Sequence, residues 1–251
     1  MKAPLSFKAA LVLIFLALLA WQAIAQENLP KLVEKIKSAV ITIITYDAGG
    51  KPKRQGSGFF INEKGQFITN CHVLAGASRI EVKTYGGQRY TVNEVVVEEP
   101  LWDLALAAIK PREEGIGSLK IFDGIPEVGA RVVIVGSPMG LEHTVSEGVV
   151  SAIRNISGFG KILEISAPVS PGSSGSPVVN LKGEVVGIAM LQLVNDQNFN
   201  FAIPGNRALA LQQRAFKKPA ASPAIVKTVP KQPPHHRPGK VPNAQSQGVT
   251  E

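Results

Sequence analysis

The sequence is poor in cysteine, with Cys71 the single one among 251 residues. One cysteine excludes an internal disulfide, so the folded core must be stable without a covalent cross-link. Cys71 precedes His72, and a Cys–His pair could indicate a thiol nucleophile. Because adjacent residues on an extended segment point in opposite directions, we expect Cys71 to be a small buried apolar side chain instead.

Long hydrophobic runs are also missing, and no apolar run reaches the roughly 20 residues that a membrane-spanning helix needs. The longest run, 9–20, follows Lys2 and Lys8 and precedes Ala23-Ile24-Ala25. This layout is typical of a secretory signal peptide, so we expect residues 1–25 to be removed by cleavage after Ala25. The alternative is an uncleaved membrane anchor. Cleavage would leave the mature protein in the periplasm or outside the cell.

Acidic side chains are outnumbered, since 19 Asp and Glu stand against 27 Lys and Arg, for a net charge of +8. The excess lies at the two ends: the signal segment carries +2 and residues 217–251 carry +5, which leaves about +1 for the rest. A nearly neutral body gives no support to a nucleic-acid-binding surface, and we expect no nucleic-acid partner.

The C-terminal segment 217–251 is rich in proline and basic residues and has no apolar periodicity. Such composition predicts a disordered tail. Its positive charge suggests a further hypothesis, contact with anionic lipid, nucleic acid or polymers of the cell envelope.

The body of the chain consists of short β-branched and apolar runs separated by turn residues, with no long amphipathic helix between them. We expect strands at 40–45, 58–61, 66–69, 79–84, 89–92, 95–98 and 101–109, and a second set at 131–135, 144–154, 161–166, 177–180, 184–190 and 200–203. Short helices are expected at 27–38 and 204–214. Regularly spaced short strands indicate an all-β barrel or sandwich.

A glycine- and serine-rich turn, V-S-P-G-S-S-G-S-P-V at 169–178, is the strongest candidate for a chemical site. A serine nucleophile needs a base for its proton and donors for the developing oxyanion. Gly172 would let the backbone bend so that the amides of Gly172 and Ser174 point into one pocket, and Gly175 would leave the turn uncrowded. These features predict Ser174 as the nucleophile. The alternative is a merely flexible turn.

A general base is most often histidine, and the chain has four. His235 and His236 lie in the expected disordered tail, and His143 lies in an expected surface loop. His72 follows a buried-looking strand, which would hold it rigidly. We therefore predict His72 as the base, with a satisfied core histidine as the alternative.

An orienting carboxylate should be buried beside the base. The aspartates are Asp47, Asp103, Asp123 and Asp196. Asp103 interrupts the apolar run L-W-D-L-A-L-A-A-I at 101–109, where an unpaired carboxylate would be costly. We predict that Asp103 pairs with the base. The alternative is an outward-facing acid on a half-exposed strand.

His72, Asp103 and Ser174 follow one another in the chain order known for chymotrypsin. The segments T-N-C-H-V-L at 69–74, W-D-L-A-L at 102–106 and P-G-S-S-G-S-P at 171–177 resemble the three catalytic segments of trypsin-fold serine proteases. Four flanking pieces are similar to the bacterial HtrA (Deg) branch: G-S-P-M-G-L from Gly136, T-V-S-E-G-V-V-S from Thr144, L-K-G-E-V-V-G-I from Leu181 and F-A-I-P-G-N from Phe201. Together they cover most of 35–210.

The resemblance implies a protease domain at 26–216, made of two six-stranded antiparallel β-barrels at about 39–110 and 127–204 with short terminal helices. It implies that His72, oriented by Asp103, activates Ser174, while the Gly172 and Ser174 amides hold the oxyanion. No metal or organic cofactor is expected.

The primary specificity pocket of this fold would be lined by three segments. They comprise Pro168, Val169, Ser170, Ile188, Ala189, Met190, Asn200, Phe201 and Ala202. None of these residues is acidic, so we expect a preference for small or medium aliphatic residues over Lys or Arg.

The sequence departs from the HtrA pattern where Ser173 and Ser176 replace the usual asparagine and glycine. We also expect no PDZ domain in the short segment after the protease domain. HtrA-like proteases are typically trimers, so a homotrimer is one expectation. Two functions remain open. One is an exported endopeptidase acting on unfolded or damaged proteins and peptides. The other is an inactive trypsin-fold module that binds peptides or partners.

Overall fold

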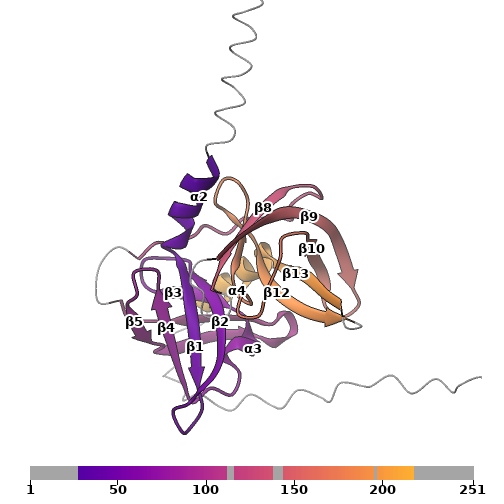
Figure 1. Cartoon of the computed structure of the whole chain (residues 1–251). Coiled ribbons are helices and arrows are strands. Elements are labelled where there is room, and N and C mark those ends of the chain that lie inside the picture. Colours follow the sequence, from indigo (N-terminus) through magenta and orange to yellow (C-terminus); the bar gives the residue numbers. More distant parts are fainter. Residues whose placement is uncertain (1–27, 112–115, 138–143, 195–196, 218–251) are drawn as a thin grey trace, which may run out of the picture.

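The computed structural model describes residues 28–111, 116–137, 144–194 and 197–217 (Figure 1). The expected signal peptide, the tail from residue 218 onward, His143, His235, His236 and Asp196 lie outside these ranges. Within them, no helix combines the length and apolar character that crossing a membrane requires. Two β units account for most of the described residues, which confirms the all-β fold class.

The first unit is an antiparallel sheet of seven strands in the order β5-β4-β1-β2-β3-β7-β6. The strands are β1 (Val40–Tyr46), β2 (Pro52–Phe60), β3 (Gln66–Thr69), β4 (Arg79–Thr84), β5 (Arg89–Thr91), β6 (Glu94–Glu99) and β7 (Leu104–Ala108). The resemblance implied six strands in a closed barrel. Here β5 and β6 are the edge strands, and the two residues that connect them link the two ends of the sheet. Val92 N donates to Ile80 O on β4 (2.9 Å), and Asn93 N donates to Ala108 O on β7 (2.9 Å).

The second unit is a closed six-stranded barrel in the order β10-β13-β12-β11-β8-β9, as expected. Its strands are β8 (Arg131–Gly136), β9 (Thr144–Ile156), β10 (Gly160–Ile165), β11 (Pro177–Val179), β12 (Val185–Val194) and β13 (Gln197–Pro204). The long β12–β13 pair runs in continuous antiparallel register from Gly187↔Pro204 to Val194↔Gln197.

Helices occur at both ends of the described chain and at two points inside the first unit. They are α2 (Asn28–Lys37), α3 (Cys71–Leu74), the 3₁₀ turn η1 (Pro100–Trp102) and α4 (Gly205–Lys217). The two terminal helices confirm the expectation from 3.6-residue periodicity. The strand expected at 101–109 begins only at Leu104, because Pro100 opens the 3₁₀ turn before it.

Three apolar cores hold the molecule together. One lies within the first sheet around Ile41, Phe60 and Phe67, and one lies within the barrel around Val132 and Leu163. The third lies between the units and includes side chains from both sheets and both terminal helices. Each terminal helix crosses to the other half: α2 packs on β8, and α4 packs on β6 and β7 as well as β12. The seam between the units is therefore a continuous core.

Candidate active site

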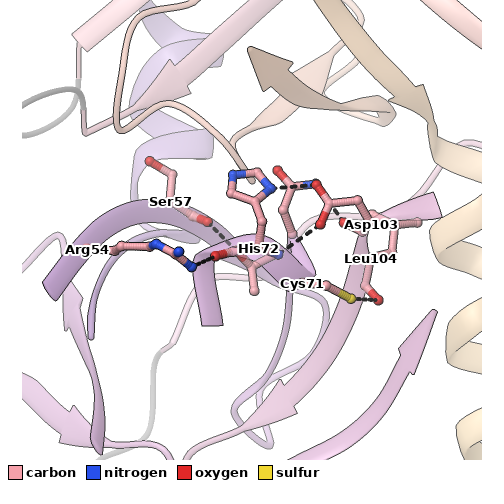
Figure 2. A network of polar contacts seen from close by, with 8 residues as sticks. Arg54, Ser57, Cys71, His72, Asp103 and Leu104 are labelled. Carbon is pink, nitrogen blue, oxygen red and sulfur yellow. Dashed lines mark hydrogen bonds and ion pairs between the residues drawn. The ribbon is translucent and has the colours of Figure 1, made fainter. Parts of the chain in front are cut away.

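His72 and Asp103 are delivered to one place by two neighbouring strands. His72 lies in α3, three residues after β3 ends, and Asp103 directly precedes β7. Strands β3 and β7 pair with Thr69 opposite Ala105, so the residues that follow one strand meet those that precede the other. His72 Nδ1 lies 2.5 Å from Asp103 Oδ2, and the His72 backbone N donates to Asp103 Oδ1 at 2.8 Å. Figure 2 shows the imidazole facing this carboxylate.

The contact with Asp103 fixes the proton of the imidazole. A carboxylate can only accept, so Nδ1 carries the N–H and Nε2 of the neutral ring is left as an acceptor. The His72 side chain is 41% exposed and that of Asp103 is 22% exposed. The ring can therefore be reached from outside, while the carboxylate that orients it is largely covered.

Asp103 is held in an unusual backbone conformation. It has φ 51° and ψ 41°, in the left-handed region, and it is the one non-glycine residue with positive φ in the described ranges. Aspartate tolerates this region better than most side chains. Its carbonyl accepts hydrogen bonds from Cys71 N (3.1 Å) and from Asn70 Nδ2 (2.9 Å). The backbone and the side chain of Asp103 are thus both hydrogen-bonded to the segment that carries His72. These bonds hold Asp103 in its left-handed conformation, and sparsely populated backbone conformations of this kind cluster at functional sites.

Cys71 is a half-buried, hydrogen-bonded thiol. Its Sγ donates to Leu104 O at 2.9 Å, as Figure 2 shows. Burial, and then the negative charge of Asp103, raise the pKa of the thiol to about 12. Cys71 is therefore a neutral thiol near neutral pH, whereas a cysteine nucleophile acts as the thiolate. The segment 71–74 is a helical turn and not the extended segment expected, so Cys71 is half-buried and hydrogen-bonded instead of fully enclosed by apolar atoms.

Ser174 lies in a tight loop between β10 and β11. Ser173 N donates to Ser170 O (2.9 Å) and Ser176 N donates to Ser173 O (2.9 Å), while Gly175 N bonds to Ala189 O on β12 (2.9 Å). Gly172 and Gly175 have φ of +94° and +88°, values that side chains with a Cβ rarely adopt. The turn is therefore ordered by its own hydrogen bonds, in contrast to the flexible turn that was the alternative.

The loop of Ser174 is bound across the seam to β2 of the first unit. Ser57 N donates to Ser174 O (2.8 Å), and Ser57 Oγ donates to Gly172 O (2.8 Å). The Ser57 carbonyl in turn accepts from Thr69 Oγ1 (2.7 Å), three residues before His72. A Cβ on Gly175 would lie 2.1 Å from that carbonyl oxygen. Ser57 thereby brings the segments that carry Ser174 and His72 against each other.

A family model of the trypsin-like peptidase domain matches residues 56–188. This range includes His72, Asp103 and Ser174. The chain belongs to the trypsin-like peptidase family. It is 34% identical over 171 residues to a probable periplasmic serine endoprotease DegP-like of Buchnera aphidicola, with 64% of this chain and 35% of the relative covered. It is 34% identical to the putative serine protease HhoA of Synechocystis, with 63% and 42% covered. The chain thus spans about a third to two fifths of these curated relatives.

A solved structure carries the same fold. The serine endoprotease from Yersinia pestis superposes with a TM-score of 0.67 at 28% sequence identity, over 75% of this chain and 66% of that one. These relatives confirm the resemblance to the HtrA (Deg) branch of the trypsin-like peptidases.

The three segments expected to line the specificity pocket of this trypsin-like peptidase do lie together. Val169 N donates to Asn200 Oδ1 at 3.0 Å, and β12 pairs with β13 so that Ala189 faces Ala202 and Met190 faces Phe201. Their exposure differs. Ile188, Ala189, Ala202, Val169 and Phe201 are buried, whereas Pro168 is exposed and Ser170, Met190 and Asn200 are half-buried. The latter four are therefore the solvent-accessible members of the set.

Two residues near the site were not singled out from the sequence. Ser57 is one, and Arg54 is the other, since its Nη1 donates to His72 O (2.7 Å) and Ala75 O (3.2 Å) and so caps the short helix α3. A signal for Ser57 was present in its flanking glycines, because glycine inside a strand often marks close backbone approach. A Cβ on Gly56 would lie 2.6 Å from Val73, and one on Gly58 would lie 2.8 Å from Ile68 O.

Metal ligands do not gather in the described ranges. No group of three or more His, Cys, Asp and Glu side chains there is arranged to hold a metal ion.

Proposed function

We propose that the protein is an exported serine endopeptidase that hydrolyses peptide bonds through Ser174, His72 and Asp103. The observation that carries this proposal is the double contact between His72 and Asp103, set beside a nucleophile loop hydrogen-bonded to the segment that precedes His72. Relatives named as serine proteases, among them the DegP-like protein and HhoA, support the same activity.

In the first half of the reaction, Ser174 Oγ attacks the peptide carbonyl while its proton passes to His72 Nε2. Asp103 keeps the other ring proton on Nδ1 and stabilises the imidazolium that forms. The carbonyl oxygen gains negative charge and is held by the amides of Gly172 and Ser174. His72 then gives its proton to the departing amine, which leaves an acyl-enzyme on Ser174.

In the second half, water attacks the acyl-enzyme. His72 takes a proton from that water as the water oxygen bonds to the acyl carbon, and it gives this proton to Ser174 Oγ when the tetrahedral intermediate collapses. The bond between the acyl carbon and Ser174 Oγ breaks, which releases the new carboxyl terminus and restores the Ser174 hydroxyl. The steps use side chains and backbone amides of this chain alone, so no cofactor is invoked.

The substrates proposed are unfolded or damaged proteins and peptides, cleaved after small or medium aliphatic residues. The half-buried Met190 and Ser170 and the absence of acidic groups among the nine pocket residues favour this preference. Profiling the cuts made in a denatured protein tests it, and a dominant preference for Lys or Arg would refute it.

A fluorophosphonate probe tests the nucleophile. We expect it to label the wild-type protein and Ser173→Ala, and to leave Ser174→Ala unlabelled. A folded wild-type protein that neither reacts with the probe nor cleaves any denatured protein would favour the alternative, an inactive module that binds peptides or partners.

The organisation of the whole chain is part of the proposal: a signal peptide at 1–25, a protease domain at 26–216 and a tail at 217–251, in a periplasmic or secreted protein. N-terminal sequencing of the mature protein locates the cleavage site, and light scattering tests a homotrimer. Deleting 217–251 should release any binding to anionic envelope polymers.

A further inference from the structure

Ser57 is a fully buried residue of β2 that contacts the Ser174 loop at two points. Its backbone N–H holds the carbonyl of Ser174 and its hydroxyl holds the carbonyl of Gly172, both at 2.8 Å. The two carbonyls belong to the peptide units on either side of the one that carries the Ser174 N–H. Ser57 of the first unit thus hydrogen-bonds the loop of the second unit on both sides of the Ser174 amide.

The Ser57 hydroxyl donates its single proton to the Gly172 carbonyl oxygen. The same oxygen accepts from Ser137 N at 3.1 Å, so the donor direction is left for the Gly172 carbonyl. Ser137 is itself held from the first unit, because Thr42 Oγ1 donates to Ser137 Oγ (2.7 Å) and Gln55 Nε2 donates to Ser137 O (3.0 Å). With Ser57 at 0% exposure, no solvent competes for these bonds.

Gly172 needs such a restraint. Its φ of +94° lies in a region open to glycine, and glycine rotates about its backbone more freely than any other residue. An oxyanion site is effective only when its donors are already aimed before charge develops, since reorientation during the reaction would cost free energy. A bond to the Gly172 carbonyl removes that freedom in the resting enzyme.

We propose that Ser57 is a positioning residue for the oxyanion site: its hydroxyl fixes the Gly172 carbonyl, so that the amides of Gly172 and Ser174 converge before substrate binds. The inference rests on the proposed peptidase activity. Ser57 does not touch the reacting atoms and acts through the loop that does.

The test compares Ser57→Ala with Thr42→Val, a variant that removes a buried hydroxyl from the same network without contacting the Ser174 loop. We expect Ser57→Ala to lower kcat about 10- to 100-fold with KM little changed, somewhat less than the loss from deleting an oxyanion donor. The affinity for a peptide boronic acid, which forms a tetrahedral adduct on serine, should fall by a similar factor. Thr42→Val should keep kcat and boronate affinity near wild type even where its melting temperature falls.

Ser57→Cys, which keeps a weaker donor, should lie between Ser57→Ala and wild type. It also decides the question if Ser57→Ala does not fold. Equal losses of kcat in Thr42→Val, or unchanged kcat and boronate affinity in Ser57→Ala and Ser57→Cys, would overturn the positioning role. A wild-type protein that cleaves nothing would instead remove the proposed function, so the two failures are distinct.

Discussion

His72 and Asp103 are joined twice through one carboxylate, with Oδ2 against the ring Nδ1 at 2.5 Å and Oδ1 accepting the His72 backbone amide at 2.8 Å. The same side chain therefore orients the imidazole and fixes the first turn of α3 that carries it. Loss of the negative charge should disturb the ring more than the backbone, since an amide oxygen can still accept from His72 N.

The first prediction concerns Asp103→Asn. The asparagine NH₂ would donate to Nδ1, which moves the ring proton to Nε2 and leaves no acceptor for the Ser174 hydroxyl. We expect kcat to fall by about four orders of magnitude with the fold retained, as checked by peptide cleavage and circular dichroism. Asp47→Asn, at an exposed turn where Oδ1 accepts from Lys51 N, is the control and should keep full activity. Activity of Asp103→Asn within tenfold of wild type would contradict the prediction.

The second prediction concerns Gly175→Ala. Its φ of +88° is unfavourable for alanine, and the new Cβ would lie 2.1 Å from the backbone oxygen of Ser57. Strain and overpacking together should cost about 3 kcal/mol of unfolding free energy, measured by urea denaturation. Gly50→Ala has φ +78° with nothing within 4 Å of its Cβ, so it should cost only about 1 kcal/mol. Equal losses in the two variants would show that the contact with Ser57 is unimportant.

The third prediction concerns Gly136 and Ser176. Ser176 Oγ is buried without a hydrogen-bond partner among the described residues, and a Cβ on Gly136 would lie 2.3 Å from it but 3.4 Å from the Ser176 Cβ. Gly136→Ala should destabilise by about 2 kcal/mol, and Ser176→Ala should stabilise by about 1 kcal/mol because it removes an unpaired hydroxyl. In the double variant most of the Gly136→Ala cost should vanish. Strictly additive unfolding free energies would refute the contact.

The fourth prediction concerns the pH dependence of Cys71. Burial raises the pKa of the thiol from 9.0 to about 12, so at pH 8 the folded protein should hold roughly a thousandfold less thiolate than the unfolded chain. Iodoacetamide should label Cys71 at least that much more slowly before unfolding than after. The stability tied to the neutral thiol is complete below pH 9.0 and is lost as the pH rises towards about 12.

The control for this labelling is a cysteine in an exposed position, Ser78→Cys in a Cys71→Ser background. It should react at similar rates in the folded and the unfolded chain. Rapid alkylation of native wild-type protein at pH 8 would contradict the burial and hydrogen bonding of Cys71.

The fifth prediction concerns Arg207 of α4. Its guanidinium stacks over the Trp102 ring, 3.9 Å from the centroid, and Trp102 directly precedes Asp103. Arg207→Ala should lower the unfolding free energy by about 1 kcal/mol and reduce kcat several-fold, since the loop that presents Asp103 loses a support. Arg207→Lys, which keeps a cation but loses the planar stack, should fall between. Wild-type kcat in Arg207→Ala would exclude this support.

Much of the fold could be predicted from local patterns. The β-branched run at 40–45 predicted β1. The spacing of apolar residues predicted α2 and α4, because a helix that buries one face carries apolar residues at the helical period. The pairing of His72 with Asp103 could also be predicted, since a carboxylate within an apolar run needs a partner and few histidines are held by rigid structure.

Other features depend on contacts between distant segments. The left-handed conformation of Asp103 follows from hydrogen bonds to the 70–72 segment, which no local pattern encodes. Ser57 resembles any strand serine until the Ser174 loop is placed against it. The link that Val92 and Asn93 make between β4 and β7 depends on hydrogen bonds to Ile80 O and Ala108 O, which lie far from them or from each other in the sequence.

The crossed packing of the terminal helices has a mechanical consequence. Because α2 rests on β8 of the second half and α4 rests on strands of both halves, tension applied at Asn28 and Lys217 loads the shared core of both halves at once. In an optical-tweezers experiment we expect the domain to rupture in a single step, without an intermediate in which one half survives alone.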